Sequence, residues 1–330
     1  MKILFIFTGG TIGSTQKGNV ICTDRGKPNK IISAYANKHG IPFEYDIVEP
    51  YTELSENNTG AIIKMLVECV KSNLHRGYDG IIVTHGTDSL QYSASAIGYC
   101  IGLDTIPVCI VSANVPVENE KSNALDNLHG AIRFIEASAG RGAFVIYRNS
   151  NSDTVQVHRT TRLIGAKAYS DEIFSLLESE YGCFDKDCNF VKNPSYKEEK
   201  DAISPLDVSV IKETNSSAML LYSYPGMKYP EIEKNVKYII LNSFHSGTVN
   251  TKSEEAISFF ENAKNKNIPV YVTGVSDGPQ YSGSDRFSEL GIIPIKNISP
   301  ISAYIKLWLI NEAGLSLNDN INASLSGDKV

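Results

Sequence analysis

The chain has 330 residues, of which 42% are hydrophobic and 21% are charged, and its formal net charge is −6. This composition is typical of a globular protein with a sizeable core, and the length favours two domains over one. The negative balance argues against nucleic acid or an anionic membrane as the main partner, because either would need a basic surface to bind.

The first residues exclude two kinds of targeting segment. Five apolar residues, ILFIF, lead directly into Thr8-Gly9-Gly10-Thr11. The run is too short for a signal peptide, and threonines and glycines stand where a small-residue cleavage site would be expected. No stretch reaches the ~18 apolar residues of a transmembrane helix. We therefore expect a cytoplasmic protein that does not bind membranes.

Strands and helices are predicted to alternate along the first part of the chain. Apolar runs predict strands at residues 3–7, 43–49, 80–84, 106–112 and 143–148, and helical spacing predicts helices at 59–74, 88–102 and 123–137. Because the strands are apolar throughout, we expect a mostly parallel sheet covered by helices on both faces. Ligands of such sheets bind beyond the carboxyl ends of the strands.

The same alternation returns after a polar stretch without periodicity. Strands are predicted at 218–224, 236–244, 269–274 and 292–295, with helices at 253–264 and 300–312. We therefore predict an α/β protein with a larger N-terminal domain at 1–184, a linker at 185–205 and a smaller C-terminal α/β domain at 206–330. The polar tail after Gly314 is expected to be partly loose.

Hydroxyl groups and glycines gather at the predicted strand ends. Thr8-Gly9-Gly10-Thr11 follows the first strand, and the segment THGTDS at residues 84–89 follows the third. No phosphate-loop motif is present. A threonine hydroxyl becomes a nucleophile only when a base takes its proton, and Thr87-Asp88 places a hydroxyl beside a carboxylate. The competing interpretations are a plain turn for the glycines and a helix N-cap for Asp88. His85 is left out of the catalytic set because a histidine at a strand end is more often structural.

Two motifs carry a specific resemblance. TGGTIGS at residues 8–14 and VTHGTDSL at residues 83–90 resemble the two signatures of the bacterial-type L-asparaginase family, in its cytoplasmic, type I-like form. That family hydrolyses asparagine, and in some members glutamine, to the acid and ammonia. The segment LSEN at 54–57, the segment DNL at 126–128 and the two-domain length also fit. The resemblance covers essentially the whole chain, most strongly to about residue 150.

The resemblance implies the catalytic roles. Thr11 would be the nucleophile that attacks the side-chain amide and forms a threonyl ester, which water then hydrolyses. Thr87, Asp88 and a lysine would form a second triad that moves protons. No cofactor or metal ion is implied. The assembly implied is a homodimer or homotetramer.

The resemblance also implies the substrate contacts. Ser55, Glu56 and Asp88 would hold the α-carboxylate and α-amino groups of the substrate. Backbone N–H groups near the nucleophile, beside Gly10, and at Gly86 and Thr87 would face the developing oxyanion.

Two departures from the family pattern concern proton transfer. Asn19 stands roughly where the family has a loop tyrosine, and an amide cannot replace a phenol in activating the nucleophile. Aligning the family's Arg-x-x-Lys motif from Arg159 puts Arg162 at the lysine position, whereas aligning from Phe174 makes Lys167 the candidate. Arginine effectively never loses its proton, while the lysine pKa can be lowered by its surroundings, so we favour Lys167 and keep Arg162 as the alternative.

The sequence supports several functional hypotheses. The first is an L-asparaginase acting on L-asparagine. The second is a glutaminase or another ω-amidase of the same fold, including an amidase subunit that supplies ammonia to a partner enzyme, although no extra recognition domain is visible. The third is an amino-acid-binding or sensing protein that has lost turnover.

The polar segment 242–248 is either a turn or a group that reaches the site of a neighbouring subunit. Cys183 and Cys188 lie near each other without a second pair, so we predict no metal site there.

Overall fold

The N-terminal part of the chain forms one eight-stranded sheet. The computed structural model describes residues 1–10, 14–17, 20–23, 28–167, 169–198, 200–278 and 281–330. The strand order of this sheet is β10-β9-β8-β7-β6-β5-β1-β4. Strands β4, β1, β5, β6 and β7 are parallel, whereas β8, β9 and β10 are antiparallel. The strands are β1 (Lys2–Phe7), β4 (Glu44–Val48), β5 (Gly80–Thr84), β6 (Val108–Val111), β7 (Ala143–Tyr147), β8 (Gln156–Arg159), β9 (Gly182–Phe184) and β10 (Phe190–Lys192).

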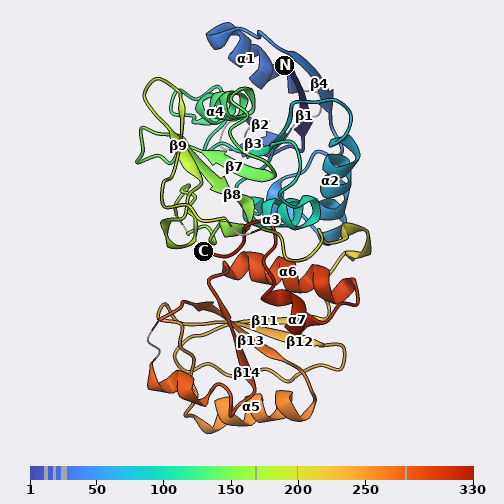
Figure 1. Cartoon of the computed structure of the whole chain (residues 1–330), viewed down its shortest axis with the longest axis vertical. Helices are drawn as coiled ribbons and strands as arrows, with labels where there is room; N and C mark the ends of the chain where they lie inside the picture. The colour runs from blue at the N-terminus through green and yellow to red at the C-terminus, as the bar shows by residue number, and fades with distance from the viewer. Residues whose placement is uncertain (11–13, 18–19, 24–27, 168, 199, 279–280) are drawn as a thin grey trace.

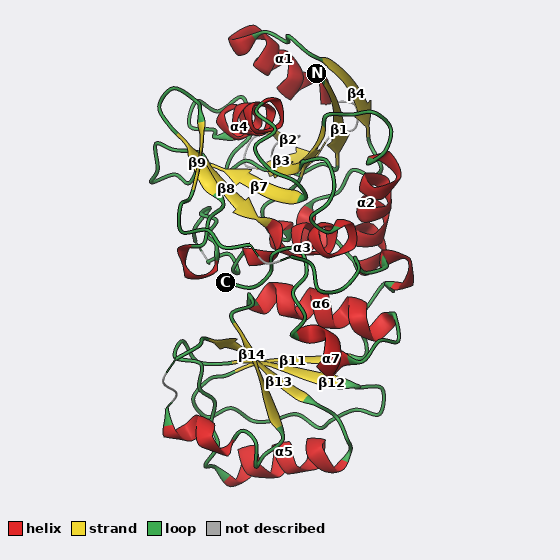
Figure 2. Ribbon diagram, in the orientation of Figure 1, coloured by secondary structure: helices red, strands yellow, loops and turns green. Residues whose placement is uncertain are grey.

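Helices cover both faces of this sheet, as the sequence predicts (Figure 2). The alternating side chains of β1 show why. Leu4 and Ile6 pack into the core under α2 (Gly60–Asn73) and α3 (Leu90–Ile101), while Ile3, Phe5 and Phe7 pack under α1 (Pro28–His39) and α4 (Ala124–Glu136). A strand that is buried on both faces needs an apolar residue at every position, which is the pattern that β1 carries.

The C-terminal part builds a second, smaller sheet with helices on both faces. Its four parallel strands, in spatial order, are β11 (Ala218–Tyr222), β12 (Tyr238–Asn242), β13 (Val270–Val275) and β14 (Ile292–Lys296). Helix α5 (Glu254–Asn265) packs on one face, and α6 (Pro300–Glu312) and α7 (Leu317–Ile321) pack on the other. The two sheets lie at opposite ends of an elongated molecule, with α3 and α6 between them (Figure 1).

Helix α6 joins the two units through their cores. Its Ile305, Trp308 and Leu309 belong to the core under the first sheet, and its Ala303 and Leu307 belong to the core of the second. A helix that is buried on almost all sides shows little amphipathic periodicity, so the sequence alone gives no sign that α6 serves both units.

Two expectations about irregular segments differ from the structure. The interval 185–205, expected as a linker, contains β10, whose Phe190 pairs with Phe184 of β9. The tail after Gly314, expected to be partly loose, contains α7 and a buried segment in which Asp328 forms an ion pair with Lys306 at 2.6 Å. Both side chains of this pair are fully buried. In each case a long-range contact, rather than local sequence, orders the segment.

Several elements have no counterpart among the sequence predictions. A hairpin, β2 (Ser14–Lys17) and β3 (Val20–Thr23), follows the first signature, and α1 comes after it. The antiparallel strands β8, β9 and β10 extend the sheet beyond β7. Short 3₁₀ helices are η2 (Ser55–Asn57), η3 (Thr160–Arg162), η4 (Leu176–Glu178), η5 (Val208–Val210) and η6 (Ser282–Arg286).

Candidate active site

The two signature segments meet because their strands are neighbours. Strand β1 pairs with β5 in parallel, with Phe7 opposite Thr84, so the polypeptide leaves both strands at the same edge of the sheet. Thr8 is buried, and its hydroxyl donates a hydrogen bond to the carbonyl oxygen of Thr84 at 2.6 Å. This bond fixes the start of the first signature against the second.

Three backbone segments touch beyond these strand ends. Gly10 has a φ of +73°, and a Cβ built there would lie 2.4 Å from the backbone nitrogen of Gly86. A Cβ on Gly86 would lie 2.5 Å from the hydroxyl oxygen of Ser55. Any side chain at either glycine would clash with its neighbour, so both positions need glycine. Gly9, which has a φ of +93°, forms a β-bridge with Glu53, so both glycines of the first signature adopt a left-handed backbone that permits these close contacts.

Ser55 and Asp88 are joined directly. The backbone N–H of Asp88 donates to the Ser55 hydroxyl at 3.2 Å, and that hydroxyl donates to a carboxylate oxygen of Asp88 at 3.4 Å. Ser89, not Asp88, occupies the N-cap position of α3 and makes no side-chain cap bond. The carboxylate of Asp88 is exposed and Ser55 is buried, so the carboxylate is held in place while one side remains open to a ligand.

A buried network that the sequence did not predict supports this pair. Ser89 donates to the carbonyl oxygen of Ser55 at 2.6 Å, and the side-chain amide of Asn58 donates to Ser89 at 3.1 Å. The same amide lies 3.2 Å from Nε2 of His85, whose other neighbour at that atom is the Ser93 hydroxyl at 3.0 Å. Asparagine and serine in a loop carry no periodic signal that would reveal such a network.

His85 occupies the centre of that network in its neutral form. Its Nδ1 lies 2.7 Å from the carbonyl oxygen of Gly86. Because a carbonyl oxygen only accepts, Nδ1 carries the proton and Nε2 is left as an acceptor. Desolvation by complete burial lowers the pKa of His85, and the bond to Gly86 opposes that shift. His85 therefore holds the backbone of the second signature, which agrees with leaving it out of the catalytic set.

A hollow of about 590 Å³ opens beside this cluster. Its lining includes three of the residues predicted to hold the substrate: Ser55, Glu56 and Asp88. The rest of its wall comes from α2, α3, α6 and β11 and from loop residues at 58–59 and 213–215, so elements of both units contribute to it. Thr87 lies elsewhere, on a small pocket of about 30 Å³ lined on its other side by residues of the segment 163–173.

The two candidates for the proton-transferring cation have different surroundings. Arg162 is buried, and its guanidinium donates to the carbonyl oxygens of Gly327 at 2.6 Å and Lys197 at 2.5 Å. Lys167 is exposed on the segment that borders Thr87, with its Nζ 5.0 Å from the ring centre of Phe174. Among the described residues neither cation hydrogen-bonds Thr87. Arg162 is committed to the C-terminal segment, which leaves Lys167 as the prediction that we keep.

Other predicted positions have simpler outcomes. Thr11 and Asn19 lie outside the described residues. In the segment 242–248, Asn242 accepts a hydrogen bond from Thr273, Ser243 donates to the carbonyl oxygen of Phe244 at 2.8 Å, and Gly247 has a φ of +76°. These bonds are those of a polar turn, and contact with a neighbouring subunit stays a prediction.

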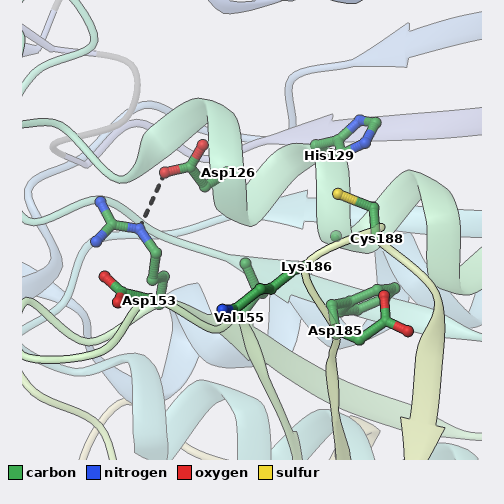
Figure 3. A pocket seen from close by; sticks show the side chains of 10 residues that line it. Asp126, His129, Asp153, Val155, Asp185, Lys186 and Cys188 are labelled. Atoms are coloured by element: carbon green, nitrogen blue, oxygen red, sulfur yellow. Dashed lines mark hydrogen bonds and ion pairs between the residues drawn. The ribbon is translucent and has the colours of Figure 1, made fainter.

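A second cavity lies away from the signature segments, between α4 and the turn that joins β9 to β10. It has a volume of about 310 Å³, with Asp126 and Asp153 on one side and Asp185 and Cys188 on the other (Figure 3). Asp126 pairs with the Arg148 guanidinium at 2.9 Å. None of the predicted site residues lines this cavity.

Two kinds of feature are absent from the described part of the protein. No cluster of three or more histidine, cysteine, aspartate or glutamate side chains is arranged to hold a metal ion among the described residues. No helix in the described ranges is both long and apolar enough to span a bilayer.

Comparison with known proteins identifies the family. A family model described as "Asparaginase, N-terminal" matches residues 2–181, more than half of the chain. The chain belongs to the asparaginase family. Among solved structures, this asparaginase-family chain resembles the thermostable L-asparaginase from Thermococcus kodakarensis, with a TM-score of 0.79 and 18% identity over 100% of this chain and 99% of that one. L-asparaginase I from Vibrio cholerae gives a TM-score of 0.75 and 19% identity, again over 100% and 99% of the two proteins. At these identities the likeness establishes the shared fold.

The curated relatives carry a different name. The D subunit of glutamyl-tRNA(Gln) amidotransferase from Methanobrevibacter smithii is 25% identical over 97% of this chain and 76% of its own length. The corresponding D subunit from Haloquadratum walsbyi is 32% identical over 68% of this chain and 50% of its own length. The asparaginase-family chain thus spans between half and three quarters of these two relatives. The family and the fold support an amidohydrolase, and the choice of amide is a separate question.

Proposed function

We propose that this asparaginase-family protein hydrolyses L-asparagine to L-aspartate and ammonia through a threonine nucleophile. The observation that carries the proposal is the junction of Gly10, Gly86 and Ser55, with Asp88 held by Ser55, directly beyond the ends of β1 and β5. This junction puts a carboxylate and a hydroxyl next to the segment that carries Thr11, at the sheet edge where such folds bind ligands.

The proposed reaction has two steps. The hydroxyl of Thr11 attacks the side-chain carbonyl carbon of asparagine, the C–N bond breaks, and ammonia leaves with the proton that the hydroxyl gave up. Water then attacks the threonyl ester and releases aspartate with the hydroxyl restored. We assign the backbone N–H groups at Gly86 and Thr87 to stabilise the oxyanion in both steps. No cofactor takes part.

We assign substrate binding and proton transfer to two sets of residues that share Asp88. Ser55, Glu56 and Asp88 bind the α-carboxylate and α-amino groups, because they share the open hollow. Thr87, Asp88 and Lys167 move the proton, with Lys167 reaching Thr87 from the segment 163–173. The position of Thr87 on a pocket lined by that segment supports this division.

The direct test measures ammonia released from L-asparagine by the purified protein. We expect turnover in the wild type and a loss of about 10³-fold or more in Thr87→Ala, since removing one member of a catalytic unit commonly costs that much. A wild-type protein that releases no ammonia from asparagine, while its circular dichroism shows a folded state, would refute the proposal.

A second candidate follows from the names of the curated relatives. As an amidase subunit, the protein would hydrolyse an amino-acid amide in order to supply ammonia to a partner enzyme that amidates glutamyl-tRNA(Gln). This candidate predicts little ammonia release by the protein alone and strong stimulation by the partner and its charged tRNA. Full turnover of free asparagine without any partner supports the first candidate.

The setting of the reaction is proposed on the same basis. We propose a cytoplasmic homodimer or homotetramer. The proposed location is supported by a solved structure of similar fold, that of a probable cytoplasmic L-asparaginase from Campylobacter jejuni. That structure has a TM-score of 0.75 and 19% identity over 97% of this chain and 98% of its own. Light scattering of the purified protein measures its assembly directly.

A further inference from the structure

The hollow beside the substrate-binding residues faces one end of the bound amino acid. Ser55, Glu56 and Asp88 line it, and these are the residues assigned to the α-amino and α-carboxyl groups. Thr87, assigned to the reacting amide, lines a different pocket. With the reacting amide assigned to Thr87 and the α-carbon groups assigned to Ser55, Glu56 and Asp88, the α-carbon end of asparagine would be the end that opens into the hollow.

The volume of the hollow exceeds the needs of one amino acid. At about 590 Å³ it falls within the range of about 300–1,000 Å³ that is typical of pockets for drug-sized ligands. A substrate that continues beyond the α-carbon would fill this space, whereas free asparagine would leave most of it to water.

The far wall of the hollow is aromatic. Tyr92 on α3 and Tyr304 on α6 meet edge to face with ring centres 6.1 Å apart, and Tyr304 lies 5.9 Å from Trp308. Leu220 on β11 is 37% exposed and lines the same space. Such a wall favours an aromatic or aliphatic group of a ligand.

The charges around the hollow have one sign. Three carboxylates line it, from Glu56, Asp88 and Glu213, and no lysine or arginine lines it among the residues that the structure describes. A cationic group of a ligand would be attracted there, and a carboxylate would be repelled. Of the three residues assigned to the α-amino and α-carboxyl groups, Ser55 is the uncharged one, and a hydroxyl can donate to a peptide carbonyl as well as to a free carboxylate.

We propose that the hollow binds the residues that follow an N-terminal asparagine, so that the protein deamidates asparagine at the N-terminus of peptides. The inference rests on the proposed function, since it uses the same nucleophile. The free α-amino group stays with Asp88 and Glu56, the α-carboxyl group becomes the first peptide carbonyl, and the next residue packs on Tyr304 and Trp308. The C–N bond of the asparagine amide breaks, water supplies the new oxygen, and the products are ammonia and a peptide that begins with aspartate.

The test compares free asparagine with three dipeptide amides, Asn-Phe-NH₂, Asn-Lys-NH₂ and Asn-Glu-NH₂, by kcat/KM for ammonia release. We expect Asn-Phe-NH₂ to be hydrolysed at least as well as free asparagine. We expect Asn-Lys-NH₂ to exceed Asn-Glu-NH₂ by about fivefold or more, the effect of roughly one exposed ion pair. Hydrolysis of free asparagine with none of the three dipeptides would overturn this inference and leave the proposed function standing. Failure with all four substrates would overturn both.

A charge reversal tests the hollow itself. Glu213 is exposed, and its side chain can be replaced without disturbing a buried contact. In Glu213→Lys, the ratio of kcat/KM for Asn-Lys-NH₂ to that for Asn-Glu-NH₂ should fall by about tenfold. The new positive charge repels the lysine side chain of the first substrate and attracts the glutamate side chain of the second, so the two kcat/KM values change in opposite directions. The matched control is Glu261→Lys on α5, on the far side of the second sheet, where the ratio should not change. An equal ratio in wild type and Glu213→Lys would contradict the proposal.

Discussion

The contact between Gly86 and Ser55 gives the sharpest structural prediction. In Gly86→Ala the new methyl group would lie 2.5 Å from the Ser55 hydroxyl oxygen, 2.7 Å from its Cβ and 3.4 Å from the Cα of Gly10. Ser55 is only 4% exposed, so its side chain has no room to turn away. The methyl group must therefore push the 55–57 turn away from the second signature.

The size of the effect follows from that geometry. An inserted methyl group in a closely packed site costs about 1–3 kcal/mol of folding free energy. A catalytic group displaced by about 1 Å loses roughly 100-fold in rate. Because Ser55 orients Asp88, we expect Gly86→Ala to remain folded with a lowered Tm and to lose about 100-fold in kcat/KM for asparagine.

Thermal unfolding and ammonia release measure the two quantities on the same preparation. The matched control is Gly283→Ala, where the nearest atom to the new methyl group is the Thr251 hydroxyl at 3.8 Å, an ordinary contact. We expect the control to keep the wild-type Tm and kcat/KM. A Gly86→Ala protein with wild-type kcat/KM would refute the claim that this close contact positions the site.

Three more predictions concern other parts of the fold. Lys167→Met should lower kcat by about 10²-fold or more and leave the Tm unchanged, because Lys167 is assigned to proton transfer. Arg162→Met should instead lower the Tm, because it removes two buried hydrogen-bond donors. If Arg162→Met lowered kcat and Lys167→Met lowered the Tm, the two assigned roles would have to be exchanged. Asp328→Ala should cost about 3–5 kcal/mol in urea unfolding, because the buried Lys306 ammonium loses its counter-charge and keeps its bond to the carbonyl oxygen of Ala323 alone as compensation. The double variant with Lys306→Met should recover much of that loss, and equal stability of the single and double variants would contradict this. Desolvation lowers the pKa of His158 to about 4 in the folded protein, below its ordinary value near 6.5. The folded state therefore favours the neutral side chain, and this contribution to folding stability is present above pH 6.5 and is lost as the pH falls toward 4. In urea unfolding, His158→Gln should flatten that pH dependence by about 3 kcal/mol between these limits, and an identical slope in the variant would refute the assignment.

The sequence predicted the parts of the fold that local periodicity controls. Strand β1 is apolar on both faces over residues 3–7, so both its strand character and its place inside a covered parallel sheet could be predicted from that run. The antiparallel strands β8, β9 and β10 escaped prediction because they are three or four residues long and are held by pairing, as between Phe190 and Phe184. Strand pairing depends on partners that are distant in the sequence.

The sequence predicted the parts of the site that lie within a motif, but not the parts that depend on contacts between distant side chains. The placement of Thr84 to Asp88 at a strand end beside Thr8 follows from the parallel-sheet rule. The network through Asn58, Ser89 and His85 does not follow from any pattern, since it joins a loop to a helix start through side chains. The sequence favoured Lys167 over Arg162 from the chemistry of the two side chains, but it could not reveal that the Arg162 guanidinium bonds the C-terminal segment.

The central claim is that Thr11 is the nucleophile of an asparagine hydrolase, and its most direct test compares Thr11→Ala with Thr11→Ser in ammonia release from L-asparagine. We predict that Thr11→Ala loses about 10³-fold or more in kcat, since the substitution removes the hydroxyl that we assign to form the ester. We predict that Thr11→Ser keeps measurable turnover, because it retains the hydroxyl. A Thr11→Ala protein that hydrolyses asparagine at the wild-type rate would contradict the account.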